Sequence, residues 1–258
     1  MKVVILAGGL GTRISEESVF KPKPMITIGE YPIIVHIMKM FSAQNFNDFV
    51  ICGGYKQDYI KEYFANYFLY NNDVTFNTKT SETIIHHTSK EEWSVTVSDT
   101  GFKTGTGGRV GRIAKYLNPD EPFILTYGDG VADIDLKKLI ECHKKSGKLA
   151  TISVYNFGQS KGVVDLSPDG SVQAFREKSD LDGDLINIGF MVLEPEVVQL
   201  CKNKKCALEG DVLAELAKQG QLNAYIHKGF WHCMDTMRDK EKLESLWEEG
   251  NAPWRIWK

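Results

Sequence analysis

The sequence has few cysteines, no long apolar run and no marked excess of charge of one sign. Its five cysteines are an odd number, and their spacing matches no CxxC zinc pattern. We therefore expect reduced thiols, as is typical of a cytosolic protein. The cysteines are Cys52, Cys142, Cys201, Cys206 and Cys233.

No stretch approaches the roughly 20 apolar residues of a membrane-spanning helix. The first apolar run, Val3–Ala7, is too short for the core of a signal peptide and ends at glycine. The formal net charge is −3, whereas a protein that binds nucleic acid by bulk attraction is usually basic. The sequence thus predicts a soluble, cytoplasmic protein without a membrane or nucleic-acid partner, in which a few placed cations hold any phosphate.

What the sequence does contain is an alternation of short apolar runs and amphipathic stretches, which is typical of βαβ units. We expect strands over residues 3–6, 49–52, 123–127 and 150–155. We expect helices over 31–44, 56–69, 135–146 and 237–249, the last of them stopped by Gly250. The fold class predicted is α/β, with a Rossmann-like mixed, mainly parallel sheet flanked by helices.

Two regions depart from this alternation. Residues 74–99 contain alternating, β-branched segments such as Ser94-Val95-Thr96-Val97, which are more typical of antiparallel ribbons. Residues 163–177 contain the hairpin signal Ser167-Pro168-Asp169-Gly170 between two apolar runs. We interpret residues 1–258 as a single domain with small antiparallel β additions, inserted near 74–109 and 157–185. The C-terminal segment carries Trp254 and Trp257, and we expect it to dock on another surface.

A glycine-rich segment follows the first predicted strand directly, and its sequence is Leu6-Ala7-Gly8-Gly9-Leu10-Gly11-Thr12-Arg13. Three glycines let the backbone approach an anion, successive N–H groups can bind it, and Arg13 adds a planar set of donors. The pattern is neither GxxxxGK[ST] nor GxGxxG. Alone, such a turn is as often only a tight connection between a strand and a helix.

The next motif, Lys21-Pro22-Lys23-Pro24, is a stiff segment with two cations. Each proline fixes its own φ and restricts the residue before it, so a lysine here can be held at a set place. A solvated basic turn is the alternative. Next to the glycine loop, we interpret the segment as a phosphate clamp.

Two aspartates are candidate ligands of a magnesium ion. Asp129 follows an apolar strand between Gly128 and Gly130, and in open α/β sheets ligands collect at the carboxyl ends of strands. Asp235 precedes Thr236, a candidate helix N-cap. A turn role for the first and a helix-terminus role for the second are the alternatives. A metal cluster of His227, His232 and Cys233 is disfavoured, because their spacing fits no standard ligand set.

Taken together, these motifs resemble the sugar-1-phosphate nucleotidylyltransferases in order and spacing. The likeness covers essentially the whole chain and includes LAGGLGTR, KPKP, TYGDG at 126–130, Glu177-Lys178 and then Asp235. Within that group the chain is most similar to the glucose-1-phosphate cytidylyltransferases. The segments that carry this closer likeness are HIMKM at 36–40, KEYFANYFL at 61–69, TGGR at 106–109 and LWEEGNAPW at 246–254.

The resemblance implies a magnesium-dependent transfer of a cytidylyl group from CTP to a sugar 1-phosphate, glucose 1-phosphate in that group, which gives CDP-glucose and pyrophosphate. It also implies a symmetric homo-oligomer. Arg13 and Lys23 would neutralise the triphosphate, and Asp129 and Asp235 would bind Mg²⁺. The residues implied for CTP are Leu6, Ala7, Gly8, Gly9, Leu10, Gly11, Thr12, Arg13, Lys23, Thr104, Arg109 and Gly128. Those implied for the sugar phosphate are Lys178, Glu177 and Asn187.

The sequence departs from the family pattern on the sugar side. Ser179 replaces the proline of EKPK, Ile188 replaces a glycine of NGGF, and Leu208 replaces the tryptophan of WE. A different phosphorylated acceptor is therefore one alternative, and a non-catalytic nucleotide-binding sensor is another. A dinucleotide-dependent oxidoreductase is disfavoured, because GxGxxG is absent and no acidic residue follows the second strand.

Overall fold

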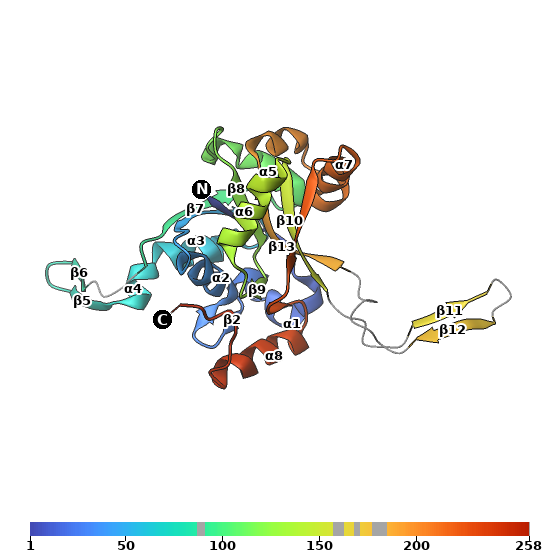
Figure 1. Cartoon of the computed structure of the whole chain (residues 1–258). Helices are drawn as coiled ribbons and strands as arrows, with labels where there is room; N and C mark the ends of the chain where they lie inside the picture. The colour runs from blue at the N-terminus through green and yellow to red at the C-terminus, as the bar shows by residue number, and fades with distance from the viewer. Residues whose placement is uncertain (87–90, 157–162, 168–170, 177–184, 258) are drawn as a thin grey trace.

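A seven-stranded sheet forms the centre of the computed structural model, which describes residues 1–86, 91–156, 163–167, 171–176 and 185–257. The strand order is β14-β10-β13-β8-β1-β4-β7, of which β10, β13, β8 and β7 are labelled in Figure 1. Every neighbouring pair is parallel except those of β13, which runs antiparallel to β8 and to β10. The sheet is thus mixed and mainly parallel, as the sequence predicts. Its strands are β1 (Val3–Ala7), β4 (Asp48–Gly53), β7 (Ser94–Asp99), β8 (Phe123–Tyr127), β10 (Ala150–Asn156), β13 (Leu185–Leu193) and β14 (Leu222–His227).

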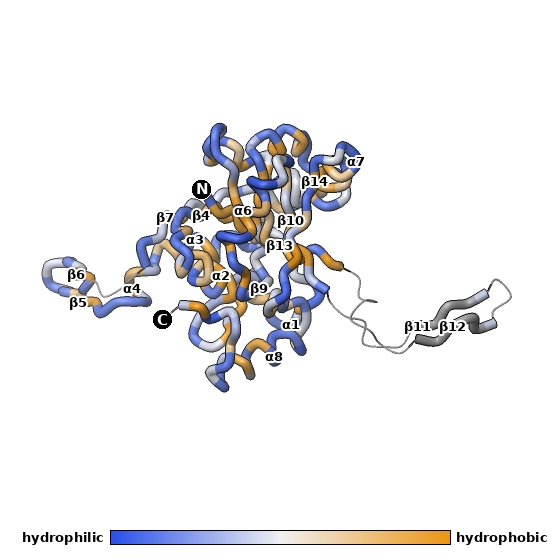
Figure 2. Tube along the Cα trace, viewed as in Figure 1, coloured by the Kyte–Doolittle hydropathy of each residue, from blue (hydrophilic) through white to orange (hydrophobic). Residues whose placement is uncertain are grey.

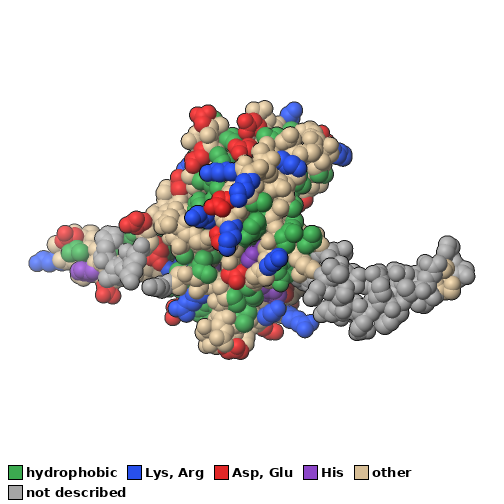
Figure 3. Space-filling model, in the orientation of Figure 1, with side chains coloured by type: hydrophobic (Ala, Val, Ile, Leu, Met, Phe, Trp, Pro, Cys, Tyr) green, Lys and Arg blue, Asp and Glu red, His purple; other side chains and the backbone are tan. Residues whose placement is uncertain are grey.

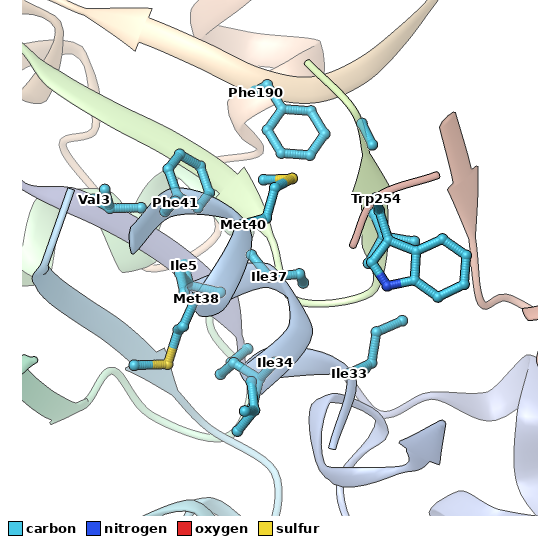
Figure 4. Close-up of a cluster of buried hydrophobic side chains, with 14 of the residues drawn as sticks. Val3, Ile5, Ile33, Ile34, Ile37, Met38, Met40, Phe41, Phe190 and Trp254 are labelled. Carbon is cyan, nitrogen blue, oxygen red and sulfur yellow. The ribbon is translucent and has the colours of Figure 1, made fainter. Parts of the chain in front are cut away.

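Helices cover both faces of the sheet, which explains why β1 is apolar and buried along its whole length. On one face, α2 (Ile33–Ser42), α6 (Leu136–Ser146) and α8 (Met237–Glu248) contribute to one hydrophobic cluster. Figure 4 shows part of it, with Ile37 and Phe41 of α2 near Phe190 of β13. The other cluster takes apolar side chains from α5 (Thr106–Arg112), η4 (Pro195–Leu200), η5 (Leu208–Leu213) and α7 (Ala214–Lys218). Figure 2 shows hydrophobic residues concentrated along the central strands.

Two of the predicted helices differ from what the sequence predicts: one is shorter and the other is interrupted. Residues 31–32 form the short strand β3 (Tyr31–Pro32) with β2 (Thr27–Ile28), so α2 begins at Ile33. The helix expected over 56–69 is split into α3 (Gln57–Ala65) and α4 (Tyr67–Asn71). At the break, the side chain of Asn66 donates a hydrogen bond to the carbonyl of Glu62 at 2.9 Å. The backbone N–H of Asn66 donates to the same carbonyl at 3.0 Å, and Asn66 itself has φ of −102° and ψ of 9°, outside the helical range, which marks the interruption.

The prediction of antiparallel ribbons over 74–99 is correct for one pair of strands and wrong for the next. β5 (Asp73–Asn77) and β6 (Glu82–His86) pair antiparallel and extend away from the body of the molecule (Figure 1). Residues 94–97 instead belong to β7, which pairs parallel with β4. β7 is the last strand of the sheet and is only partly covered. Its alternating sequence therefore reflects an edge position rather than a separate ribbon.

The hairpin predicted at 163–177 is present as β11 (Val163–Leu166) and β12 (Val172–Arg176), which pair antiparallel. Residues 168–170 of its turn lie outside the described residues. Short helices complete the described chain: η1 (Thr12–Ile14), α1 (Ser15–Ser18), η2 (Lys23–Met25) and η3 (Ala114–Tyr116). None of the helices in the described ranges is long and apolar enough to span a membrane. Figure 3 shows basic and acidic side chains intermixed on the face in view.

The last helix and the C-terminal segment pack on the chain itself. Thr236 and Asp239 form a reciprocal capping box at the start of α8, and Gly250, with φ of 71°, follows its end. Beyond it, Trp254 is 1% exposed and its Nε1 donates a hydrogen bond to Nδ1 of His36 at 3.2 Å. The docking surface expected for this segment is therefore α2 of the same chain.

Candidate active site

The glycine loop and Asp129 lie side by side because they follow neighbouring strands. β1 and β8 pair in parallel, so both segments leave the sheet at the same edge. The backbone N–H of Gly128 donates to the carbonyl of Leu6 at 3.0 Å. A Cβ at position 128 would lie 3.1 Å from that carbonyl oxygen and from Cγ of Pro24. The close approach of three segments thus explains why glycine precedes Asp129.

The loop itself has two different kinds of glycine. Gly11, with φ of 65°, adopts the left-handed conformation just before η1. Gly8 is restricted by packing instead, because a Cβ there would lie 2.1 Å from a nitrogen of Arg109. A Cβ at Gly9 would meet no atom within 4 Å. The loop is therefore anchored at Gly8 and Gly11 and open at Gly9.

Four charged side chains meet beside this loop. Nζ of Lys23 donates to Oδ2 of Asp129 at 2.5 Å and to Oδ1 of Asp235 at 2.7 Å. A guanidinium nitrogen of Arg13 donates to Oδ2 of Asp235, also at 2.7 Å. The structure thus brings together all four residues that the sequence analysis names for catalysis, although Asp235 is more than a hundred positions from Asp129.

The ionisation of the cluster follows from these contacts. Burial works to lower the pKa of Lys23, but the charge of Asp129 and the hydrogen bonds to both carboxylates outweigh it, so that pKa is raised. Burial works to raise the pKa of Asp235, but Lys23 and Arg13 outweigh it, so that pKa is lowered. Near neutral pH the cluster therefore holds an ammonium, a guanidinium and an ionised Asp235.

Asp235 reaches Asp129 through a small second sheet. β15 (Trp231–Cys233) pairs with β9 (Gly130–Ala132), and the next N–H, that of Met234, donates to the carbonyl of Asp129 at 2.9 Å. Cys233 lies in the same strand, and its Sγ donates to Oδ2 of Asp235 at 3.6 Å. Burial, with the two aspartates, raises the pKa of the Cys233 thiol to about 12, so it stays protonated. The capping box of α8 then fixes the backbone after Asp235.

A cavity of about 360 Å³, which we call the loop cavity, opens between the glycine loop and the charged cluster. A second cavity of about 400 Å³, the acceptor cavity, shares Arg13, Tyr127, Asp129 and Asp235 with it as a common wall. The loop cavity is lined by Leu6, Ala7, Gly8, Gly9, Gly11, Thr12, Arg13, Lys23, Pro24, Thr104, Gly105, Thr106, Arg109, Tyr127, Gly128, Asp129 and Asp235. Of the loop residues predicted for CTP, only Leu10 lies outside this lining, and it is 49% exposed.

Arg109 braces the loop cavity from behind. Its guanidinium donates to the carbonyls of Gly8, Gly53 and Gly101 at 2.9–3.0 Å and to Oγ1 of Thr100 at 2.7 Å. Burial lowers the pKa of Arg109, although the group remains a cation. These contacts give the side chain a structural role: it ties the glycine loop to β4 and to the segment after β7.

Thr104 offers a different feature in the same cavity. It is 7% exposed, and among the described residues its Oγ1 is buried without a hydrogen-bond partner. Buried hydroxyls are usually bonded, so the unpartnered Oγ1 of Thr104 at the wall of this cavity is a candidate contact for a ligand.

The acceptor cavity contains Asn187, the one described residue of the three predicted for the sugar phosphate; Glu177 and Lys178 lie outside the described residues. It also contains Glu209, which the sequence analysis did not name for the site. Oε1 of Glu209 accepts from the hydroxyl of Tyr127 at 2.5 Å, and Oε2 accepts from Oγ1 of Thr106 at 2.8 Å. Glu209 is the glutamate of the WE pair whose tryptophan Leu208 replaces, so the family pattern points to this position, but its partners come from β8 and α5.

Two of the departures from the family pattern occupy the core. Ile188 is 3% exposed and belongs to one hydrophobic cluster, and Leu208 is fully buried in the other. Ile188 also contributes to the wall of the acceptor cavity. The backbone between Asn187 and Phe190 requires the glycine that is kept: Gly189 has φ of 92°, and a Cβ there would lie 2.9 Å from the Tyr127 ring.

The donor set suits a hard divalent cation. Asp129 and Asp235 both reach the same Lys23 nitrogen, so their oxygens converge on one point at the common wall of the two cavities. Oxygen ligands are those that Mg²⁺ prefers, and it is often bound by one or two carboxylates together with substrate phosphates. Asp129 and Asp235 are therefore the residues that fit such an ion.

The fold and the site define a protein of the nucleotide-binding α/β class. A family model described as "Nucleotidyl transferase" matches residues 2–251. The chain belongs to this family, whose members generally use a divalent metal ion. This match confirms the resemblance that the motifs carry, and with it the predicted class of enzyme, a nucleotidyltransferase.

Individual relatives agree with this placement. A glucose-1-phosphate cytidylyltransferase of Salmonella typhi is 52% identical over 257 residues, which cover 100% of both chains. A Bacillus subtilis protein named "Probable glucose-1-phosphate cytidylyltransferase" is 40% identical, again over 100% of both chains. Among solved structures, a UDP-glucose pyrophosphorylase from Acinetobacter baumannii has a TM-score of 0.70 at 21% identity and covers 97% of this chain and 95% of its own. That likeness confirms the α/β fold.

Proposed function

We propose that the protein transfers a cytidylyl group from CTP to a sugar 1-phosphate, with α-D-glucose 1-phosphate as the acceptor and Mg²⁺ as the metal ion. The products are CDP-glucose and pyrophosphate. One observation carries the proposal: Arg13, Asp129 and Asp235 lie in the common wall of two cavities, and Lys23 of the loop cavity bonds to both carboxylates. The names of the full-length relatives supply the cytosine base and the glucose acceptor.

The reaction joins two anions. A phosphate oxygen of the sugar 1-phosphate attacks the α-phosphorus of CTP, a new P–O bond forms, and the bond to the β-phosphate oxygen breaks as pyrophosphate leaves. At an effective dielectric of 20, one pair of unit charges 4 Å apart repels by roughly 4 kcal/mol. In this proposal the positive charges of Arg13 and Lys23 offset this repulsion. No general base is required, because the attacking phosphate oxygen is already ionised near neutral pH.

In this proposal the loop cavity holds CTP. The backbone N–H groups of the glycine loop face the phosphates, and Arg109 keeps the loop in place through the carbonyl of Gly8. The unpartnered hydroxyl of Thr104 is available to the base or ribose. Asp129 and Asp235 hold the metal ion, which supplies Lewis-acid stabilisation of the charge that develops on the phosphoryl oxygens.

The acceptor cavity holds the sugar phosphate. Asn187 and Glu209 present polar atoms to sugar hydroxyl groups, while Tyr127 separates this cavity from the loop cavity. Burial and the hydrogen bond to Glu209 raise the pKa of Tyr127, which keeps its hydroxyl as a donor. Lys178 and Glu177 complete the predicted sugar-phosphate contacts. Positioning of both substrates and stabilisation of charge then account for catalysis.

The single-domain organisation, the cytoplasmic location and the homo-oligomer belong to the proposal as well. Phe76 at 64% and Ile84 at 47% are exposed on opposite faces of the β5–β6 ribbon and form no single apolar patch, so the homo-oligomer is supported by the family resemblance alone.

The test is a matrix of four nucleoside triphosphates against a panel of sugar 1-phosphates with Mg²⁺, followed by pyrophosphate release and by mass analysis of the product. The expected result is CDP-glucose as the main product. Another CDP-sugar as the main product would assign a different acceptor. CTP binding without pyrophosphate release from any acceptor would instead establish a nucleotide-binding sensor.

A further inference from the structure

The ammonium of Lys23 lies between the two carboxylates that the proposed function assigns to the metal ion. Its Nζ is 2.5 Å from Oδ2 of Asp129 and 2.7 Å from Oδ1 of Asp235, and only 11% of the side chain is exposed. A divalent ion centred between these two carboxylates would take the position that the ammonium occupies. Lys23 and the ion therefore compete for one position.

The charge balance of the cluster favours the lysine when no nucleotide is bound. Two carboxylates face the two cations Lys23 and Arg13, so the four groups are neutral together. A divalent ion added alone would meet both cations at short range in a partly buried place, where repulsion is only weakly screened. A triphosphate changes this balance, because its negative charges attract an ammonium and a guanidinium released from the carboxylates.

The described part of the chain also offers too few ligands to hold the ion without help. Among the described residues, no group of three or more His, Cys, Asp or Glu side chains is placed to hold a metal. The remaining ligands must come from phosphate oxygens and water, as is usual for Mg²⁺.

The local backbone allows the lysine to change partners without refolding. Pro22 and Pro24 flank Lys23, and Pro22 is in the extended conformation, with φ of −65° and ψ of 146°. Lysine has a flexible stem and three donors that need no fixed geometry. The side chain can thus swing from the carboxylates to the neighbouring loop cavity, which it already lines.

We propose that Lys23 is a stand-in cation: in the nucleotide-free protein it fills the metal position between Asp129 and Asp235, and it moves to the phosphates when metal and nucleotide bind together. This rests on the proposed function, which takes the two aspartates as the metal ligands. Lys23 therefore makes metal binding depend on nucleotide binding. The coupling is positive, because each ligand raises the affinity of the protein for the other.

The test measures Mn²⁺ affinity of the nucleotide-free protein by electron paramagnetic resonance, for wild type and for Lys23→Met. Removing the competing cation should tighten Mn²⁺ binding by at least about tenfold, within the range usual for coupled sites. The gain in Mn²⁺ affinity on adding a non-hydrolysable CTP analogue should shrink by a similar factor. Unchanged or weaker Mn²⁺ binding by nucleotide-free Lys23→Met would overturn the proposal.

Lys21→Met is the matched control. It removes the same charge from the same segment, but Nζ of Lys21 lies 3.8 Å from Oε2 of Glu17, outside the cluster. Its Mn²⁺ affinity should stay within about twofold of wild type, as expected for a screened surface charge. If Lys23→Met does not fold without metal, Lys23→Gln takes its place, because the amide keeps a hydrogen bond to a carboxylate without the charge, and the same comparison decides.

The measurement involves no turnover, so the two proposals can fail separately. If wild type makes a CDP-sugar but Lys23→Met binds Mn²⁺ no more tightly, only the stand-in role is wrong. If Lys23→Met binds Mn²⁺ more tightly but wild type makes no product from any acceptor, the stand-in role holds and the proposed function is wrong.

Discussion

The loop cavity and the acceptor cavity share a wall but are built in different ways. The loop cavity is framed by segments that directly follow β1 and β8, two adjacent strands of the central sheet. The acceptor cavity collects Asn187 from β13, Glu209 from η5 and Trp231 from β15. One half therefore depends on the backbone geometry of the sheet edge, and the other on single side chains brought together by the tertiary fold.

This difference has an energetic consequence. In the loop cavity, Arg109 is buried and holds three backbone carbonyls, so binding and stability depend on the same contacts. In the acceptor cavity, Glu209 is exposed, and its contacts are side chain to side chain. We expect substitution of Arg109 to change both stability and affinity, and substitution of Glu209 to change affinity alone.

The largest effect is expected for the two aspartates that belong to both halves. Asp129→Asn and Asp235→Asn should each lower the rate of pyrophosphate release by about 1,000-fold, because each removes a charged ligand of the metal ion. Asp235 pairs with two cations, whereas Asp129 pairs with one. Asp235→Asn should therefore also lower the free energy of unfolding more than Asp129→Asn does, as measured in urea.

Asp135→Asn is the control for these variants. Asp135 is the N-cap of α6, and its side chain accepts from the N–H of Lys138 at 3.0 Å, a role that asparagine also fills. The rate of pyrophosphate release by Asp135→Asn should match that of wild type. Near-normal rates for both Asp129→Asn and Asp235→Asn would show that the metal assignment is wrong.

Arg109→Met should give the largest loss of stability in the loop half. The change leaves the carbonyls of Gly8, Gly53 and Gly101 without these donors and should lower the free energy of unfolding by roughly 3 kcal/mol. The KM for CTP should rise in parallel, because the glycine loop loses its anchor. Urea unfolding and steady-state kinetics measure the two effects.

Arg112→Met provides the comparison, since Arg112 is exposed and its NH1 donates to one carbonyl, that of Thr100, at 3.0 Å. The Arg112→Met substitution should lower the free energy of unfolding by less than about 1 kcal/mol, as is usual for surface substitutions. Equal losses for the two arginine variants would argue against a special bracing role of Arg109.

His36 tests the packing of α2 against the C-terminal segment that follows α8. It is fully buried, its Nδ1 accepts from Trp254, and its Nε2 therefore carries the proton and donates to the carbonyl of Ile28 at 2.8 Å. Burial lowers its pKa to about 4, below the 6.5 of the unfolded chain. Between these values the unfolded state binds more protons, so the contribution of His36 to stability is present above pH 6.5 and is lost as the pH falls toward 4.

His36→Gln should remove this pH dependence, because glutamine can donate and accept but does not titrate. The difference in unfolding free energy between wild type and His36→Gln should narrow by about 2 kcal/mol from pH 7 to pH 4, since one pKa unit corresponds to 1.36 kcal/mol and the full shift is an upper bound. Urea unfolding at several pH values gives both curves. Parallel curves would mean that His36 keeps an ordinary pKa in the folded protein.

The contrast between the loop cavity and the acceptor cavity also explains which parts of the fold and the site the sequence predicts. The central strands and most helices follow from hydrophobic periodicity, and the loop half follows from motifs adjacent to strands, because neighbouring parallel strands bring their carboxyl ends together. That Asp235 meets Asp129 depends on the β9–β15 pairing, which no local pattern encodes. β7 was misassigned because an edge strand and a ribbon share the same alternation. Glu209 stands in the WE pair of the family pattern, but its contacts with Tyr127 and Thr106 cannot be read from that motif, because these partners are remote in sequence.

The smallest effect is expected for Glu209→Gln in the acceptor half. Glu209 accepts one hydrogen bond at each oxygen, from Tyr127 and from Thr106, and glutamine can accept at only one. Losing one such contact at an exposed site should raise the KM for the sugar 1-phosphate by about tenfold, equivalent to 1.4 kcal/mol, and leave the free energy of unfolding unchanged. Steady-state kinetics with each substrate varied in turn separates the two KM values.

Glu215→Gln, the same change in α7 and outside both cavities, should leave both KM values as in wild type. The informative quantity is the KM for CTP in Glu209→Gln. A change of up to about twofold is smaller than the loss of a single hydrogen bond usually causes. If the KM for CTP stays within that range of wild type, the two cavities act independently. If it rises as much as the KM for the sugar phosphate, the Tyr127–Glu209–Thr106 contacts transmit the change through the common wall, because Thr106 and Tyr127 both line the loop cavity. The division into a backbone-built half and a side-chain-built half would then be wrong.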